Sequence, residues 1–197
     1  MTAIDDINPR DDALIVIDVQ KDFCQGGALA VPEGDEVVRP LNRLLDLPWA
    51  TIVGTRDWHP PKHSSFKDSG GPWPPHCVQH TDGAAFHPDL NTGAFQKVID
   101  KGVDVDDPGY SALRNTDLGD HLKAHGVKRV FVGGLATNIC VRETVLDLLK
   151  ESYKVVVVTD ATRGVDINPG DTNRALREME ERGVSLVSSV DVRRPLA

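Results

Sequence analysis

The sequence predicts an α/β fold: a doubly wound, mostly parallel six-stranded sheet with helices on both faces. Six β-rich segments alternate with helical patterns along most of the chain, and this alternation is typical of parallel sheets. Several of these segments are nearly continuous aliphatic runs, as expected when helices cover both faces of a sheet. Because a chain of 197 residues can bury a substantial core, we expect one domain over residues 1–197.

The predicted strands are short and rich in aliphatic and β-branched residues, which suit a buried, pleated surface. In chain order they are ALIVIDV (13–19), WATIVGT (49–55), FQKVID (95–100), KRVFVGG (128–134), YKVVVVTDA (153–161) and VSLVSS (184–189).

The predicted helices lie between these strands. They are DEVVRPLNRLLDL (35–47), DLGDHLKAHG (117–126), NICVRETVLDLLKES (138–152) and GDTNRALREMEERG (170–183). Acidic or amide side chains near their starts can cap exposed N–H groups, and glycines close two of the four segments.

Composition excludes several classes of protein. With 22 Lys and Arg against 30 Asp and Glu, the net charge of −8 disfavours nucleic acids and anionic membranes as partners. The start of the chain lacks the basic and apolar regions of a signal peptide, and no apolar run approaches the roughly 18 residues of a membrane span. We therefore expect a cytoplasmic protein with a small-molecule substrate, and a homo-oligomer is compatible with these features. Three cysteines form no disulfide framework, so at least one thiol is free.

Residues 56–94 interrupt the alternation of strands and helices. This segment has no periodicity, yet it contains five of the seven histidines, six of the thirteen prolines and two of the three tryptophans. Long loops without secondary structure are usually functional or disordered, and an aromatic, histidine-rich composition argues against disorder. We expect an ordered loop that builds a site.

Reactive side chains follow four consecutive predicted strands. Asp18 ends the first strand, Asp57 and His59 follow the second, Lys101 follows the third and Cys140 follows the fourth. Ligands of open α/β sheets bind beyond the carboxyl ends of the strands. The topology therefore predicts that these side chains gather at one edge of the sheet.

Cys140 lies two residues after Asn138, which we expect to be a helix N-cap. The exposed N–H groups and positive dipole of a helix start favour a thiolate, so Cys140 is a candidate nucleophile. The small-residue turn before it also allows the amides of Ala136 and Cys140 to bind a developing oxyanion. The alternative is a buried cysteine that acts as a small apolar residue.

Asp18 lies inside an apolar strand, where a carboxylate is costly unless it is paired or functional. Lys101 can pair with it, and one interpretation is a structural ion pair. The other is catalytic: a carboxylate beside a thiol takes its proton and later delivers it to a leaving group, while an ammonium favours both anions.

The loop after the second strand offers metal ligands, namely Asp57, His59, His63 and His76. Histidine and carboxylate suit one divalent transition metal, with zinc favoured over iron or manganese. A D-x-H pattern alone is weak, and lone histidines are often surface residues or hydrogen-bonded in the core.

Five segments, in order, carry a resemblance to a known family. ALIVIDVQKDFCQGGALAV, GTRDWHPPKHSSF, GGPWPPHCVQHTDGAAFHPDL, VIDKG and GLATNICVRETVLDL are similar to the nicotinamidase and pyrazinamidase branch of the isochorismatase-like cysteine hydrolases. The resemblance implies a Rossmann-like three-layer fold and a Cys, Asp and Lys triad that hydrolyses nicotinamide to nicotinate and ammonia, a step of NAD salvage. It assigns Cys140 as nucleophile, Asp18 as proton carrier and Lys101 as the third member.

The resemblance also implies metal ligands and a substrate pocket. The ligands fall on Asp57, His59 and His76, and His63 matches a fourth histidine used by some members. Phe23 and Trp73 match the aromatic walls around a pyridine ring, and a non-proline cis peptide near LAT is characteristic of the family. Asn138 stands where many relatives carry Asp. Tyr110, just past Lys101, either lines the pocket or packs in a surface turn.

Two other functions fit the residues. The nearest is a hydrolase of the same superfamily that acts on a different amide or on a vinyl ether without the metal, against which the intact Asp57, His59 and His76 argue. The other is a non-catalytic metal-binding or thiol-redox module, against which the lack of a C-x-x-C motif and of a phosphate-binding glycine loop argues.

Overall fold

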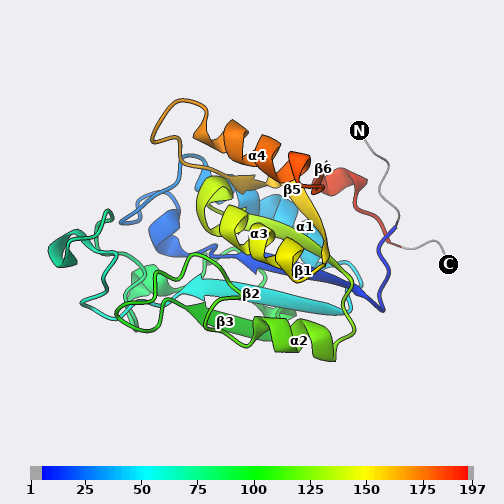
Figure 1. Cartoon of the computed structure of the whole chain (residues 1–197), viewed down its shortest axis with the longest axis horizontal. Helices are drawn as coiled ribbons and strands as arrows, with labels where there is room; N and C mark the ends of the chain where they lie inside the picture. Colours follow the sequence, from blue (N-terminus) through cyan, green and yellow to red (C-terminus); the bar gives the residue numbers. More distant parts are fainter. Residues whose placement is uncertain (1–5, 195–197) are drawn as a thin grey trace.

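A computed structural model describes residues 6–194 of the chain. Its centre is one six-stranded sheet in the order β3-β2-β1-β4-β5-β6, with every neighbouring pair parallel. This confirms the predicted doubly wound sheet, because the chain reverses its direction of winding at β1 (Figure 1). The strands are β1 (Asp12–Ile17), β2 (Thr51–Asp57), β3 (Lys97–Lys101), β4 (Arg129–Leu135), β5 (Lys154–Arg163) and β6 (Ser185–Val187).

In the described part of the chain four α-helices cover the sheet, and they occur where the sequence predicts them. They are α1 (Val38–Leu45), α2 (Leu118–Ala124), α3 (Arg142–Lys150) and α4 (Asp171–Glu181). The first expected helix begins as a 3₁₀ turn, Gly34–Val37, and the third begins as a π-helical turn, Thr137–Val141. No helix of the described residues 6–194 is both long and apolar enough to cross a membrane.

The core consists of two apolar layers, one on each face of the sheet. Alternate residues of β1 point to opposite faces: Leu14 and Val16 belong to one layer, and Ala13, Ile15 and Ile17 belong to the other. The first layer includes the buried face of α1, and the second includes buried residues of α2, α3 and α4. Because β1 is fully buried on both faces, it reads as a continuous aliphatic run.

The end of β4 approaches β1 very closely. Gly134 has a φ of +120°, and a Cβ atom there would lie 2.0 Å from the backbone oxygen of Ile17. Glycine is therefore required at this position. The next peptide bond, between Leu135 and Ala136, is cis, as the family resemblance implies.

The histidine-rich segment between β2 and β3 folds into short turns. It contains the short 3₁₀ turns Lys67–Ser69, Asp82–Ala84 and Thr92–Ala94. A bridge between His59 and Val78 folds it back on itself beyond the end of β2. The segment therefore forms a wall above the carboxyl edge of the sheet.

Candidate active site

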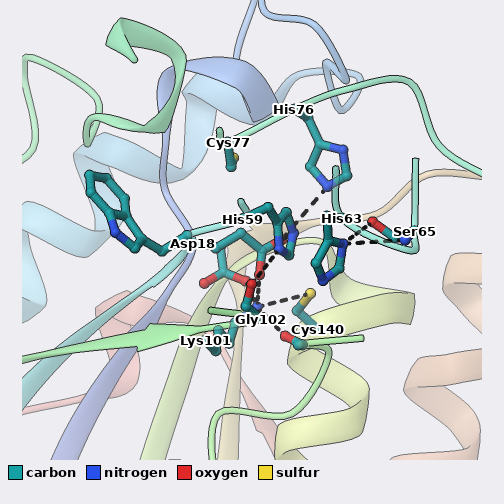
Figure 2. Close-up of polar contacts among 12 residues, drawn as sticks. Asp18, His59, His63, Ser65, His76, Cys77, Lys101, Gly102 and Cys140 are labelled. Atoms are coloured by element: carbon teal, nitrogen blue, oxygen red, sulfur yellow. Dashed lines mark hydrogen bonds and ion pairs between the residues drawn. The ribbon is translucent and has the colours of Figure 1, made fainter. Parts of the chain in front are cut away.

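The carboxyl edge of the sheet brings together the side chains that the strand ends predict. Asp18 directly follows β1, Asp57 and Lys101 are the last residues of β2 and β3, and Cys140 lies in the π-helical turn after β4. Figure 2 shows Asp18, Lys101 and Cys140 converging below the histidines of the loop. The reactive oxygens of Asp18 and Asp57 and the sulfur of Cys140 all lie within 4.8 Å of one another.

Lys101 lies at the centre of this cluster. Its Nζ atom is 2.6 Å from Oδ2 of Asp18 and is also paired with Asp57. The same ammonium donates to the carbonyl oxygen of Gly109 at 2.7 Å and lies 3.5 Å from the sulfur of Cys140. Only 1% of Lys101 is exposed. One buried cation therefore contacts two carboxylates and the candidate nucleophile.

Burial and this cation set the charge states of the cluster. Burial raises the pKa of Asp18 to about 6, although the Lys101 charge opposes the rise. Burial also raises the pKa of Asp57, but Lys101 and His59 outweigh it and hold the pKa below its usual value. Burial lowers the pKa of Lys101, but both carboxylates outweigh this and raise it well above its usual value. At neutral pH the cluster therefore holds one ammonium between two carboxylates.

The Cys140 thiol differs from the expectation that its position at a helix start favours a thiolate. Burial raises its pKa well above the ordinary value, and Asp57 and Asp18 add to the rise, while Lys101 lowers it. Cys140 is 5% exposed but lines a cavity at this edge of the sheet. Its resting form is thus a thiol that needs a base, and Asp18 is a carboxylate with an oxygen within 4.8 Å of the sulfur.

The backbone and side chains around Asp18 hold it in place. Asp18 has a φ of +49°, a left-handed conformation that is uncommon outside glycine and that Asp tolerates. Its Oδ1 atom accepts a hydrogen bond of 2.7 Å from the Thr55 hydroxyl, and its N–H donates to the Thr55 carbonyl at 3.1 Å. Its Oδ2 atom is the one that is ion-paired with Lys101, and among residues 6–194 it makes no hydrogen bond of good geometry.

Three of the four predicted metal ligands lie together. Single donor atoms of Asp57, His59 and His76 lie within 4.8 Å of one another, and all three residues are buried. Nδ1 of His59 is 3.0 Å from the Gly102 carbonyl, and Nδ1 of His76 is 2.8 Å from the Pro74 carbonyl. Because a carbonyl only accepts, both Nδ1 atoms carry the proton.

The remaining nitrogen of each ring faces the Asp57 carboxylate. The Nε2 atoms of His59 and His76 lie 3.4 Å and 3.9 Å from Oδ2 of Asp57. Two imidazoles and a carboxylate, with the outer nitrogens held by carbonyls, are the ligand and outer-shell pattern of a divalent transition metal. The residues present fit such an ion.

His63 lies beside this centre but points its ring nitrogens elsewhere. Its ring stacks on His59 with centroids 4.0 Å apart. Nδ1 contacts the Ser65 hydroxyl at 2.6 Å, and Nε2 contacts the Asp107 carbonyl at 2.6 Å. His63 is therefore not grouped with the other three donors and supports His59 through stacking.

A cavity opens directly above Cys140. It encloses about 480 Å³, open space at its mouth included. The predicted pocket residues Phe23, Trp73 and Tyr110 all line it, and the indole N–H of Trp73 donates to the Tyr110 hydroxyl at 3.0 Å. Its other lining residues are Leu29, Ala30, Val31, Asp57, His76, Ala136, Ile139, Cys140 and Val165. Apolar walls with a few polar groups at one end suit a flat, mostly apolar ring.

The turn that carries Cys140 is held differently from the expectation. Asn138 is not an N-cap: Ala136 precedes the π-helical turn, and no side chain caps it. The Asn138 amide instead makes a reciprocal pair with Val165, donating to its carbonyl at 2.8 Å and accepting from its N–H at 3.0 Å. Asn138 therefore fastens the Cys140 turn to a residue of the cavity wall.

Comparison with known proteins identifies the family. The isochorismatase domain model matches residues 12–191. The chain belongs to the isochorismatase family. It is 41% identical over 205 residues to the nicotinamidase of Escherichia coli strain K12, and the match covers 91% of this chain and 95% of that protein.

Two solved structures are similar in fold to this chain. The pyrazinamidase of Pyrococcus horikoshii in complex with zinc is 46% identical, with a TM-score of 0.82 over 90% of this chain and 99% of that chain. PnC1 from L. infantum in complex with nicotinate is 36% identical, with a TM-score of 0.92 over 96% of this chain and 98% of that chain.

Sequence reasoning missed several residues of this isochorismatase-type site. Gln20 is fully buried; its amide donates to the carbonyls of Asp57 and Ala84, and its oxygen accepts the Asp57 N–H. Thr55 was predicted only as part of a strand, yet it holds Asp18. A buried polar residue beside a charged one is the signal that could have found both, since such groups need partners.

Proposed function

We propose that this protein hydrolyses nicotinamide to nicotinate and ammonia, and pyrazinamide in the same way, through a thioester on Cys140. The main support for the proposal is that three features lie together at one edge of the sheet. They are the Cys140, Asp18 and Lys101 cluster, the Asp57, His59 and His76 centre, and a cavity with aromatic walls. The nicotinamidase relative of E. coli, which aligns over most of the chain, supports the choice of amide.

We propose Asp57, His59 and His76 as the ligands of one divalent metal, most simply zinc, as in the zinc complex of the P. horikoshii pyrazinamidase. When bound, the ion supplies a positive charge that orients a heteroaromatic ring by its nitrogen or polarises a water. Phe23 and Trp73 enclose such a ring on an apolar surface. The ring is thereby placed with its carboxamide toward Cys140.

The first half of the reaction transfers the acyl group to sulfur. Asp18 takes the Cys140 proton, and the sulfur attacks the carboxamide carbon while Lys101 stabilises the anions around it. The amides of Ala136 and Cys140 bind the oxyanion. As the C–N bond breaks, Asp18 returns the proton to nitrogen, so ammonia leaves and the acyl group remains as a thioester.

The second half releases the acid. Asp18, again ionised, removes a proton from a water molecule that attacks the thioester carbon. The C–S bond breaks, the carboxylic acid leaves, and the sulfur recovers a proton from Asp18. The chain returns to its starting state with one amide and one water consumed.

Ammonia release from nicotinamide, pyrazinamide and a simple aliphatic amide tests the proposal. We expect turnover of the two aromatic amides, little turnover of the aliphatic amide, and loss of almost all activity in Cys140→Ala. Normal ammonia release by Cys140→Ala would refute the nucleophile. Turnover of the aliphatic amide alone would support a hydrolase of the same family with a different substrate.

A further inference from the structure

A second group of potential ligands lies outside the active site. Single donor atoms of Cys24, Asp35 and His87 lie within 4.8 Å of one another. They come from three separate segments: the turn after β1, the 3₁₀ turn before α1, and the loop before β3. None of the three contributes to the triad or to the Asp57 centre. Their convergence is therefore independent of the proposed reaction.

Cys24 is the buried member of this group. It is 3% exposed and is a free thiol. Its side chain belongs to the apolar layer that includes α1. On its other side the group adds a carboxylate and an imidazole, both of which bind metals. Cys24 thus differs from a buried thiol that only apolar side chains surround.

The other two members are already aligned with each other. Nε2 of His87 lies 3.2 Å from Oδ1 of Asp35, while Nδ1 accepts the Asp89 N–H at 3.1 Å. Oδ2 of Asp35 accepts the Gln25 N–H at 2.7 Å, which fixes the carboxylate. The His87 side chain is 13% exposed and that of Asp35 is 41% exposed, so an ion can enter from the Asp35 side.

We propose that Cys24, Asp35 and His87 bind a divalent transition-metal ion of the zinc class, separate from the catalytic centre. Thiolate, imidazole and carboxylate together are the ligand set of zinc, and water completes a four-coordinate shell. A thiolate beside a carboxylate is repulsive, and a divalent cation between them turns this repulsion into attraction. Calcium and magnesium, which need a shell of oxygen ligands, do not fit.

Binding involves two proton movements. The Cys24 thiol loses its proton to solvent, and the sulfur bonds to the ion. If His87 coordinates through Nε2, its ring proton moves to Nδ1, and the hydrogen bond from Asp89 is given up. Three metal bonds thus replace one hydrogen bond that the His87 ring donates to Asp35 and one that it accepts from Asp89.

The ion would fasten part of the substrate cavity. Cys24 directly follows Phe23, whose carbonyl accepts the Val31 N–H at 3.0 Å, and both Phe23 and Val31 line the cavity. Linking Cys24 to His87 ties this wall to the loop before β3. Binding to the folded state alone also raises the melting temperature as the metal concentration increases.

Counting bound ions tests the proposal. The metal-stripped protein is reloaded with zinc and dialysed, and zinc per chain is measured by mass spectrometry for wild type, Cys24→Ser and His87→Gln. We expect both variants to hold one ion fewer per chain than wild type, whatever the occupancy of the Asp57 centre. His125→Gln replaces an exposed histidine outside the group and keeps the wild-type count. Equal counts in wild type, Cys24→Ser and His87→Gln would overturn the proposal.

Cobalt provides a second readout. A thiolate bound to cobalt gives a near-ultraviolet charge-transfer band. We expect this band in wild type and in His125→Gln. In Cys24→Ser, the same equivalent of cobalt should not produce it. Circular dichroism establishes that each variant is folded. If Cys24→Ser does not fold, the ion count of His87→Gln decides alone. A wild-type spectrum unchanged in Cys24→Ser would contradict Cys24 as a ligand.

Discussion

The hydrogen bond from Thr55 to Asp18 allows a sharp test of the proton carrier. In Thr55→Val the side chain keeps its shape, but Oδ1 of Asp18 loses a donor at 2.7 Å. That hydrogen bond lowers the pKa of Asp18, against the burial that raises it to about 6. Removing the donor therefore raises the pKa of Asp18 further.

The size of this change follows from the energy of the lost bond. A hydrogen bond to a charged group contributes about 1.5–3 kcal/mol, and one pKa unit corresponds to about 1.4 kcal/mol. The pKa of Asp18 should therefore rise by about 1–2 units. Because the proposed mechanism requires an ionised Asp18 to accept the thiol proton, activity should fall as the pH drops through this pKa. The acidic limb of the profile should thus move to higher pH in Thr55→Val.

The assay is kcat/KM for ammonia release from nicotinamide, measured between about pH 5 and about pH 9. Thr51→Val is the matched control, since Thr51 lies at the other end of β2 with its hydroxyl 2.9 Å from Nε2 of His121. We expect the acidic limb of the pH profile of Thr51→Val to coincide with that of wild type. The acidic limb of Thr55→Val should lie at higher pH. Coincidence of all three limbs, or a downward shift in Thr55→Val, would refute Asp18 as the base.

Three further outcomes are expected. Lys101→Met leaves the buried carboxylates of Asp18 and Asp57 without their cation. The free energy of unfolding, measured in urea, should therefore fall by about 3–5 kcal/mol, and ammonia release should nearly vanish. An unchanged free energy of unfolding would contradict the buried ion pairs. Trp73→Phe and Tyr110→Phe each remove the bond between indole and hydroxyl, so KM should rise about fivefold in each. In the double variant KM should rise no more than in either single variant. If the two effects on KM were additive, this hydrogen bond would be unimportant for binding. Chelation of the metal should raise KM while kcat holds, with recovery on adding zinc; a fall in kcat alone would give the ion a chemical role.

Much of the site could be predicted because topology alone places it. In a parallel sheet every strand ends at the same edge, so Asp18, Asp57, Lys101 and Cys140 had to meet once the strands were located. The aliphatic runs located those strands, since burial of both faces leaves little room for polar residues. The fold and the edge of the active site therefore follow from the hydrophobic pattern.

The conformation of individual turns could not be predicted in the same way. Asn138 is a residue type that often caps helices, yet its side-chain amide forms hydrogen bonds with Val165, 27 residues further along the chain. Helix propensity describes a residue and its nearest neighbours, whereas this pairing depends on where β5 ends. The charge state of Cys140 follows the same logic: the helix start favours a thiolate, but burial outweighs it and raises the pKa of the thiol.

Strand register completes the site. Val16 pairs with Gly54, which brings Thr55 alongside the residues at the end of β1, and Asp57 pairs with Lys101 on the next strand. A shift of one residue would turn each of these side chains to the opposite face of the sheet. The site thus requires both registers at once, because Asp18 needs Thr55 from one pairing while Lys101 needs Asp57 from the other. A substitution that loosens the packing of β2 should therefore displace Asp18 and the Asp57, His59 and His76 cluster together, although it touches neither.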